Sequence, residues 1–144
     1  MQLHAARETL HSSLGTLILR LALATVMIAH ALLKLLVFTL PGAAAFFAAH
    51  GFPGWTAYPV FALELAGGLL LAAGVAVRIV SLVLIPVMLG ALAVHLPNGW
   101  MFTAPGGGWE YIALILAALA AQALLGPGAW AWDVRRKSPA PSGS

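Results

Sequence analysis

Four long apolar runs dominate the pattern of hydrophobic and polar residues along the chain. They cover roughly residues 14–38, 56–77, 79–95 and 109–125, and a polar segment, 1–13, precedes the first run. A helix needs about 20 apolar residues to cross about 30 Å of hydrocarbon, with a range of about 17–25. Backbone groups in lipid must bond internally, and the runs lack the alternation of barrel strands. The pattern therefore predicts four transmembrane helices.

The connections between the runs predict how these helices are arranged. Little more than Arg78 separates the second run from the third, which predicts a tight helical hairpin. The connections 39–55 and 97–108 are longer and rich in Gly and Pro, and the apolar stretch 43–50 predicts a short helix in the membrane interface. We expect an all-α, integral membrane four-helix bundle with up-down-up-down topology. The membrane domain would cover 14–133, between an N-terminal segment 1–13 and a disordered tail 134–144.

The composition supports a membrane protein and excludes several other classes. Hydrophobic residues make up 62% of the 144 residues, and charged residues make up 8%. So few charges cannot cover a water-soluble globule, and intrinsic disorder needs low hydrophobicity. The chain has no cysteine, which excludes disulfides, thiolate metal sites, iron–sulfur clusters and a dithiol relay within it.

The basic residues outside the apolar runs predict the orientation in the membrane. They all fall on the side of the two termini and the short hairpin, and they are Arg7, Arg78, Arg135, Arg136 and Lys137. The two long loops contain no Lys or Arg. The positive-inside rule then places both termini in the cytoplasm. The net charge is +3, but the sequence contains no motif that reads a nucleic-acid groove, so we expect no nucleic-acid partner.

Ionisable side chains inside the apolar runs are the candidate functional residues, because such groups are costly in a membrane unless they are paired. Arg20 lies in the cytoplasmic half, where we expect it to snorkel to the interface, with Gln122 as a possible acceptor. Five others lie at a similar depth in the outer half, and one polar residue accompanies them in the adjoining loop. These six are His30, Lys34, Glu64, His95, Asn98 and Glu110.

The helix faces place these groups on inward stripes. His30 and Lys34 are neighbours at i, i+4. Glu64 shares a face with Gly67 and Gly68, and small residues let helices approach closely in a bilayer. By the same reasoning, we expect the face of Glu110 to be packed inward with the small residues Ala113, Ala117 and Ala121. Lys34 would pair with Glu64 or with Glu110, and a buried ion pair that only fixes helix register is the structural alternative.

Several stretches together resemble the DoxX family of small bacterial membrane proteins. They are LRLALATVMIAHALLKL with Arg20, His30 and Lys34; ELAGGLLLAAGVAVR with Glu64 and Arg78; VHLPNGW with His95 and Asn98; and GGWEY with Glu110. The resemblance covers about residues 14–133. It implies a four-helix bundle in the bacterial inner membrane. It also implies an association with redox systems, since DoxX-like chains are linked to a thiosulfate:quinone oxidoreductase and to complexes with superoxide dismutase and a sulfurtransferase.

The outer-half cluster has the groups that quinone chemistry needs. A quinone carbonyl needs a hydrogen-bond donor, and its reduction needs protons from titratable groups. We therefore predict a membrane subunit of a redox system that binds quinone or relays protons. Glu64, His30 and Lys34 would take part in the chemistry. The predicted cofactor-binding residues are His30, Lys34, Glu64, His95, Asn98 and Glu110.

Other functions remain open at this point. Two His and two Glu resemble the ingredients of a metal site in a helix bundle, and His30 and His95 are alternative haem ligands. The apolar runs contain no Glu-x-x-His pair, however, and we assign no metal ligand. A non-catalytic scaffold and a small-solute or proton transporter are further alternatives. Enzymatic activity of the chain alone stays open, and the expected partners are the lipid bilayer and either other protein subunits or further copies of the chain.

Overall fold

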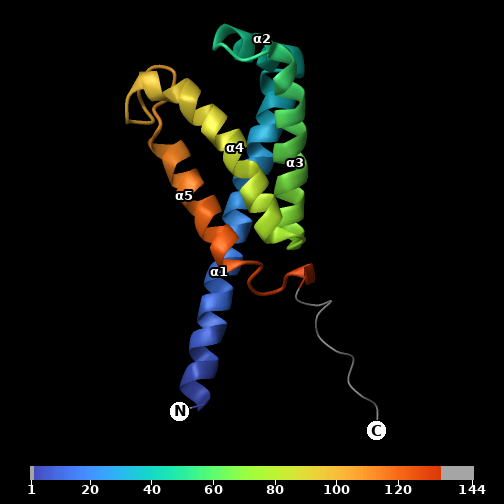
Figure 1. The fold of residues 1–144 in the computed structure, drawn as a ribbon, viewed down its shortest axis with the longest axis vertical. Coiled ribbons are helices and arrows are strands. Elements are labelled where there is room, and N and C mark those ends of the chain that lie inside the picture. Colours follow the sequence, from blue (N-terminus) through green and yellow to red (C-terminus); the bar gives the residue numbers. More distant parts are fainter. Residues whose placement is uncertain (1, 134–144) are drawn as a thin grey trace.

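The chain folds into helices joined by turns and one longer loop (Figure 1). The computed structural model describes residues 2–133, with side chains from residue 7 onward, and contains no strand in that range. Its α-helices are α1 (Gln2–Leu32), α2 (Leu40–Ala49), α3 (Ala57–Ala73), α4 (Val77–His95) and α5 (Glu110–Leu125). Short helical turns η1 (Leu33–Val37), η2 (Gly54–Thr56) and η3 (Leu96–Asn98) connect them. The all-α prediction is confirmed, whereas the tail 134–144 lies outside the described residues.

The helix α1 buries one stripe of residues spaced three or four apart. Leu17, Arg20, Ala24, Met27 and Ala31 are all buried on it. This spacing is the period of an α-helix, and the stripe packs mainly against α3, which runs beside α1 in Figure 1. The polar residues 2–13 continue the same helix and project beyond the bundle (Figure 1). The boundary expected after residue 13, between the N-terminal segment and the membrane domain, is therefore only a change in polarity within one continuous helix.

A tight turn at residues 74–76 joins α3 to α4, and its position corrects the sequence expectation. Gly74 adopts the left-handed conformation (φ 72°), and its N–H and that of Val75 donate to carbonyls in the last turn of α3. This pair of bonds is the Schellman motif that glycine favours at helix ends. Arg78, which we expected to mark the turn, lies instead in the first turn of α4. Its side chain reaches α5, as described below.

The helix α5 packs against α4 and presents a different face from the one expected. Its buried residues are Ile112, Ile115, Leu119 and Gln122. Ala117 is exposed, so the expected inward face with Ala113, Ala117 and Ala121 is wrong. Branched apolar side chains fill the space between α4 and α5, and this packing leaves the small residues at the edge of the interface and outside it.

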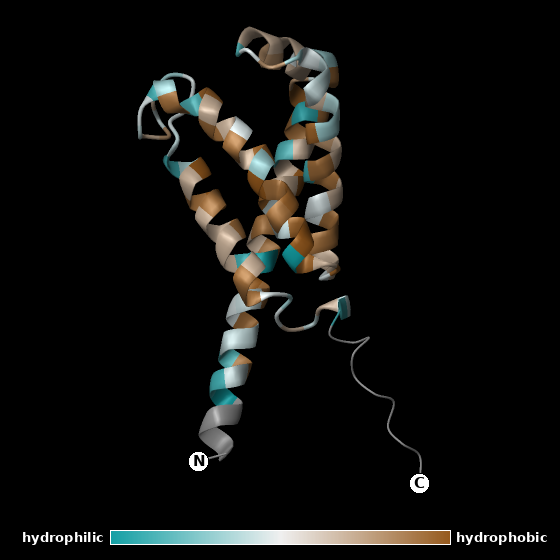
Figure 2. Ribbon diagram, viewed as in Figure 1, coloured by the Kyte–Doolittle hydropathy of each residue, from teal (hydrophilic) through white to brown (hydrophobic). Residues whose placement is uncertain are grey.

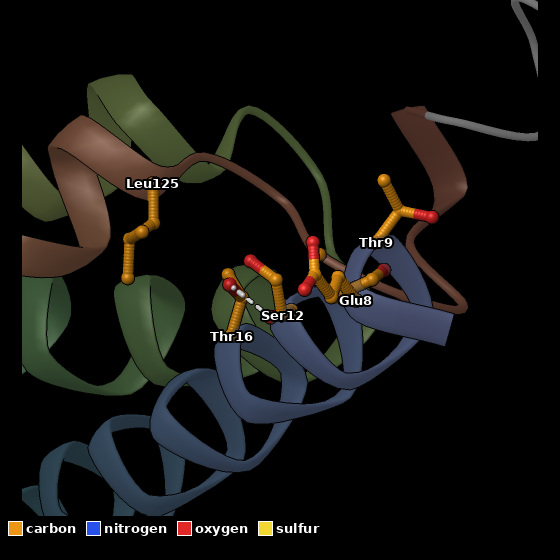
Figure 3. A pocket seen from close by; sticks show the side chains of 7 residues that line it. Glu8, Thr9, Ser12, Thr16 and Leu125 are labelled. Carbon is orange, nitrogen blue, oxygen red and sulfur yellow. Dashed lines mark hydrogen bonds between the residues drawn. The ribbon is translucent and has the colours of Figure 1, made fainter. Parts of the chain in front are cut away.

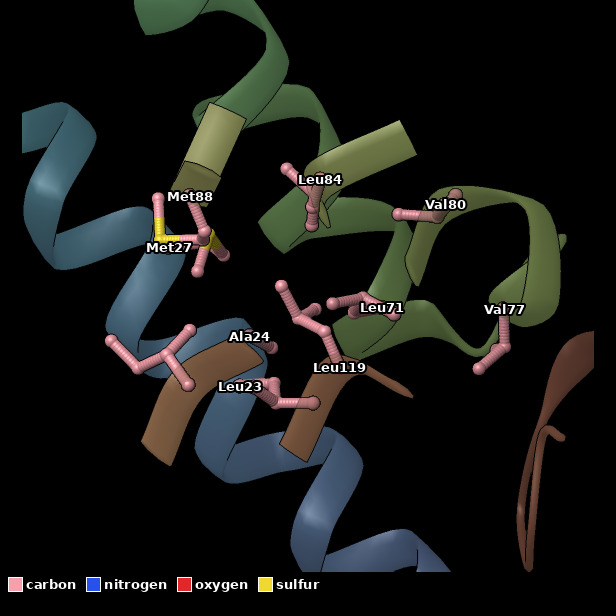
Figure 4. Close-up of a cluster of buried hydrophobic side chains, with 10 residues drawn as sticks. Leu23, Ala24, Met27, Leu71, Val77, Val80, Leu84, Met88 and Leu119 are labelled. Carbon is pink, nitrogen blue, oxygen red and sulfur yellow. The ribbon is translucent and has the colours of Figure 1, made fainter. Parts of the chain in front are cut away.

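One apolar core holds the bundle together (Figure 4). It is formed by side chains from α1, α3, α4 and α5, namely Leu23, Ala24, Met27, Leu71, Val77, Val80, Leu84, Met88, Ile115 and Leu119. Met27, Leu71 and Leu119 are completely buried. Because α1, α3, α4 and α5 all contribute to this core, buried polar side chains of these helices lie toward the two ends of the bundle and outside the core.

The apolar surface of the helices fits a lipid bilayer. Most residues of the bundle helices are hydrophobic, whereas hydrophilic residues occur in the projecting part of α1 and toward the ends of the bundle (Figure 2). Many large hydrophobic side chains of these helices are exposed. Three segments are long and apolar enough to cross a membrane: Arg7–Val37, Gly54–Ala73 and Val77–Asn98. The helix α5 is apolar but has 16 residues. That corresponds to about 24 Å at about 1.5 Å per residue, so a fourth span stays a prediction.

The two ends of the bundle are built differently. At one end, α2 lies across the ends of its neighbours, and the loop 99–109 joins α4 to α5 (Figure 1). We call this the loop end. The other end carries the turn at residues 74–76 and the segment 126–133, which crosses beneath the helices and which we call the strap (Figure 1). The expected short helix at 43–50 is α2, which begins at Leu40, after Thr39 caps it by accepting the N–H of Gly42.

Candidate functional site

A buried ion pair joins α1 to α3 near the loop end. Nζ of Lys34 lies 2.9 Å from Oε1 of Glu64 and 2.7 Å from Oε2. Glu64 is 2% exposed, whereas the side chain of Lys34 keeps 15% of its surface exposed. Of the two partners that the sequence left open for Lys34, the structure shows Glu64 and not Glu110. The two charges neutralise each other, which is what allows a carboxylate to lie inside an apolar bundle.

Close packing of α1 on α3 brings the pair together. Glu64 shares the buried face of α3 with Gly67 and Gly68, as the sequence predicts. A Cβ on Gly68 would lie 2.7 Å from Cγ1 of Ile28 and 3.1 Å from the carbonyl oxygen of Ala24. Only a glycine lets the backbone of α1 approach this closely. Glu64 lies one turn before Gly68 and therefore reaches Lys34 across a narrow interface.

A π-helical turn, which the sequence analysis missed, carries Lys34. The turn η1 covers Leu33–Val37, and the N–H of Phe38 bonds to the carbonyl of Leu33 over 3.0 Å. Turns of this kind are rare and occur frequently at functional sites. The next residue, Thr39, has φ 60° and ψ 155°, a backbone conformation that is uncommon for a β-branched residue. No residue pattern in this apolar segment predicts the extra residue in the turn.

His30 lies beside the ion pair with its ring uncommitted. It is half-buried one turn before Lys34, and its charge would interact with those of Lys34 and His95. Within residues 2–133, neither ring nitrogen makes a hydrogen bond to the protein. His30 lies one helical turn before Lys34 and within electrostatic range of Lys34 and His95. We call His30, Lys34 and Glu64 the ion-pair cluster.

His95 and Asn98 bind the loop 99–109. Nδ1 of His95 lies 2.9 Å from the carbonyl oxygen of Gly107. The amide of Asn98 donates to the same oxygen over 2.9 Å and to that of Gly106 over 3.1 Å. Gly106 and Gly107 have φ near 80°, which glycine adopts without strain. The structure thus gives both predicted site residues a local role in shaping this loop.

Glu110 also serves the loop. Its Oε1 accepts a hydrogen bond of 2.8 Å from the backbone N–H of Phe102. Its position at the start of α5 places a negative charge at the positive end of the helix dipole. Asn98 and Glu110 are therefore engaged away from the ion-pair cluster, and the six predicted residues fall into two groups.

A second polar cluster, at the strap end, was only partly foreseen. Arg20 is 1% exposed, so it does not snorkel to solvent, and its Nη1 donates to the carbonyl oxygen of Pro127. Gln122 is fully buried, and its amide donates over 2.7 Å to the carbonyl oxygen of Gly126, the residue before Pro127. Nε of Arg20 and Oε1 of Gln122 have no hydrogen-bond partner among the described residues. Two side chains from different helices thus hold successive carbonyls of one turn.

Arg78 completes the arrangement at the end of α5. Its Nη1 donates to the carbonyl oxygens of Ala123 and Leu124, each over 2.9 Å. These carbonyls belong to the last turn of α5, where no backbone donor is available within the helix. Arg78 therefore caps α5, and Arg20 and Gln122 hold the turn that follows it. The sequence signal for this cluster was that Arg20 and Gln122 lie at a similar depth.

Two hollows in the surface lie away from the ion-pair cluster. One, beside the projecting part of α1, is lined by hydroxyl side chains, Glu8 and Leu125, and Thr16 within it donates to the carbonyl of Ser12 over 2.9 Å (Figure 3). The other is an apolar crevice between α3 and α4 that includes Gly67 and Leu84. Across residues 2–133, no three His, Asp or Glu side chains gather closely enough to hold a metal ion.

Comparisons with known proteins point to one family. The family model described as DoxX matches residues 15–96, which contain His30, Lys34, Glu64 and His95. The chain is similar to a Bacillus subtilis (strain 168) protein named "Putative oxidoreductase CatD", with 35% identity over 79 residues. The similar region covers 55% of this chain and 58% of that relative, so the chain matches little more than half of its length. No solved structure matches the chain significantly.

Proposed function

Because the chain belongs to the DoxX family, we propose that it is the membrane subunit of an oxidoreductase system and that its ion-pair cluster binds a quinone headgroup. The family match includes all three residues of the cluster. A relative that is named an oxidoreductase supports the redox part of the proposal. The proposed site residues are His30 and Lys34 as donors to a quinone carbonyl, with Glu64 as the group that exchanges a proton with Lys34.

The observation that carries this proposal is the spare hydrogen-bonding capacity of the cluster. An ammonium group has three N–H donors, and Lys34 uses two of them on Glu64. His30 has no hydrogen bond to the described residues, although it lies half-buried between charged groups. The side chain of Lys34 keeps part of its surface exposed, and its sequence neighbours Leu33, Leu35 and Leu36 are exposed apolar residues. This exposure supports access of a lipid-soluble molecule to the remaining N–H donor of Lys34.

The test is a thermal shift measurement with short-chain quinones. The purified protein in detergent is heated with and without decylubiquinone or a menaquinone analogue. We expect a quinone to raise the melting temperature of the wild type, and His30→Ala to remove most of the shift. His50→Ala is the matched control, because His50 directly follows α2 and its ring bonds to the carbonyl of Phe46. That variant should keep the full shift.

A non-catalytic scaffold is the second candidate, and the loop end favours it. His95, Asn98 and Glu110 all bind the loop 99–109, and Lys34 and Glu64 satisfy each other's charge. If no quinone shifts the melting temperature of the wild type, or if His30→Ala keeps the whole shift, the ion-pair cluster is a structural clamp and the scaffold is the better description. Copurification of partner subunits would then define the function.

We also propose that the protein lies in a bacterial inner membrane, with both termini in the cytoplasm and with protein subunits or further copies as partners. The projecting part of α1 and the strap are at the same end of the bundle, since the N–H of Ala129 bonds to the carbonyl of Ser13 over 3.0 Å. That end also carries Arg7 and Arg78. The distribution of basic residues supports the cytoplasmic placement.

A further inference from the structure

The first half of the loop 99–109 is held to the start of α5. The N–H of Trp109 donates to the carbonyl of Gly99 over 3.1 Å, and the N–H of Glu110 donates to that of Trp100 over 3.0 Å. The carboxylate of Glu110 accepts the N–H of Phe102. The rings of Trp100 and Trp109 meet edge to face, with their centroids 4.4 Å apart. These contacts close the base of the loop and fix the direction of its first residues.

The second half of the loop is folded by turns and by contacts with the end of α4. The N–H of Ala104 donates to the carbonyl of Met101 over 2.9 Å, and the N–H of Gly107 donates to that of Ala104 over 2.8 Å. Side chains in α4 and η3 bind the carbonyl of Gly107. The loop therefore satisfies much of its own backbone, and a polar backbone needs this wherever water is scarce.

Three consecutive large apolar side chains are exposed on this loop. Trp100 is 52% exposed, Met101 is 54% exposed and Phe102 is 65% exposed. Residues 99–109 contain no Asp, Glu, Lys or Arg. Single exposed apolar residues are ordinary on a protein surface, whereas a contiguous apolar patch marks an interaction site. We call Trp100, Met101 and Phe102 the apolar tip.

The length of α5 places the apolar tip close to the hydrocarbon layer of a membrane. The helix has 16 residues, which is about 24 Å at about 1.5 Å per residue, and the hydrocarbon layer is about 30 Å thick. It is also inclined to α1 (Figure 1). As the predicted fourth span, α5 cannot carry both of its ends beyond this layer. The loop that leads into α5 therefore lies at the membrane boundary and does not project far into water.

We propose that the apolar tip inserts into the boundary layer of the bilayer leaflet at the loop end. The indole of Trp100 suits the headgroup boundary, because its ring is largely apolar and its N–H needs a polar partner. Met101 and Phe102 gain free energy when they leave water for the ends of the acyl chains. The loop carries no charge that would hold it in water or select a charged headgroup. The insertion does not depend on quinone binding at the ion-pair cluster.

The test uses the absence of cysteine from the chain, since Met101→Cys or Phe102→Cys then accepts a nitroxide label at a single position. Each labelled protein is reconstituted into phosphatidylcholine vesicles with a water-soluble nickel chelate on both sides. Power-saturation EPR measures how often the nitroxide collides with oxygen, which concentrates in hydrocarbon, and with the chelate, which stays in water. We expect the ratio of oxygen to nickel collisions at positions 101 and 102 to be raised well above the value in water.

Two further positions of the same chain calibrate this ratio. Glu8→Cys, on the projecting part of α1, gives the value in water, and Leu89→Cys, exposed near the middle of α4, gives the value in hydrocarbon. The ratios at 101 and 102 should lie between these two. Ratios equal to that of Glu8→Cys would place the loop in water, and infrequent collisions with both reagents would place it against protein; either result overturns the proposal. Met101 and Phe102 are both exposed, so each substitution checks the other without removing a buried contact.

Discussion

Single residues in this protein act mainly by satisfying charge and hydrogen bonds in places that water does not reach. Lys34 and Glu64 neutralise each other between α1 and α3. Arg20 and Gln122 satisfy two carbonyls beyond α5, and Arg78 satisfies two more within it. Lys34 and Glu64 thus join α1 to α3, Arg20 joins α1 to the strap, and Arg78 joins α4 to the end of α5.

The ion pair gives a prediction at this scale. Glu64→Ala leaves the ammonium group of Lys34 without its partner, and removing one member of a buried pair costs about 3–5 kcal/mol. We expect a large loss in the free energy of unfolding in detergent. The double variant Glu64→Ala/Lys34→Ala should recover part of it, because no unpaired charge remains.

Glu8→Ala is the control, since Glu8 is exposed on the projecting part of α1 and the change should fall within about 0.5 kcal/mol. Denaturant titration of the wild type, Glu8→Ala, Glu64→Ala, Lys34→Ala and the double variant supplies the values. Losses that simply add in the double variant would show that the two side chains do not stabilise each other.

At the scale of elements, the sequence predicted the all-α fold and the buried face of α3, but not the buried face of α5. The face of α3 with Glu64, Gly67 and Gly68 followed from the sequence, because only glycine permits such close packing. The face of α5 did not follow, because Ile and Leu there compete with Ala for the core and packing decides between them. The π-helical turn η1 was equally hidden, since an extra residue in a turn changes no pattern of polarity.

Some contacts of the polar groups at the candidate site were also predictable from the sequence, and others were not. The pairing of Lys34 with Glu64 was within reach of the sequence, because depth and face both matched. The engagement of His95 and Asn98 by the loop was not, because it depends on the conformations of Gly106 and Gly107. Arg20 was misjudged because the strap that covers it has no apolar pattern.

Two glycines on neighbouring helices provide the prediction for this scale. Gly68→Leu should destabilise the protein by about 1–3 kcal/mol or more, because its Cβ would press on Ile28 and on the backbone of Ala24. Gly90→Ala is the matched change on α4, where nothing lies within 4 Å of the added Cβ. It should stabilise the helix by about 0.5–1 kcal/mol. Melting temperatures in the same detergent compare the two, and an unchanged Gly68→Leu protein would contradict the close packing of α1 on α3.

The whole molecule has a clear polarity, with aromatic and glycine-rich connections at the loop end and the basic residues at the strap end. The last described residues of the strap and the start of α1 lie at the same end (Figure 1). Both termini are therefore expected on one side of the membrane. From the positive-inside rule and the basic residues in the sequence, we predict that this side is the cytoplasm.

Reporter fusions test this orientation. A cytoplasm-active reporter at the C-terminus should be active, and a periplasm-active reporter at the same position should be inactive. The same periplasm-active reporter inserted between Thr103 and Ala104, which lie in the loop 99–109, should be active. The opposite pattern would invert the molecule and place the ion-pair cluster nearer the cytoplasm.

The apolar core between the two polar clusters has an electrical consequence. Arg20 and His30 are ten positions apart on α1, which is about 15 Å along the helix, and Leu23, Ala24 and Met27 fill that stretch with buried apolar side chains. Such a layer is a dielectric barrier, so most of a transmembrane voltage falls across it and across the lipid beside it. A proton that enters the ion-pair cluster from the loop end crosses only a small part of that voltage. Quinone chemistry at this cluster would then exchange protons with one side of the membrane while doing little work against the potential, which is worth about 2.3 kcal/mol per charge for each 100 mV fully crossed.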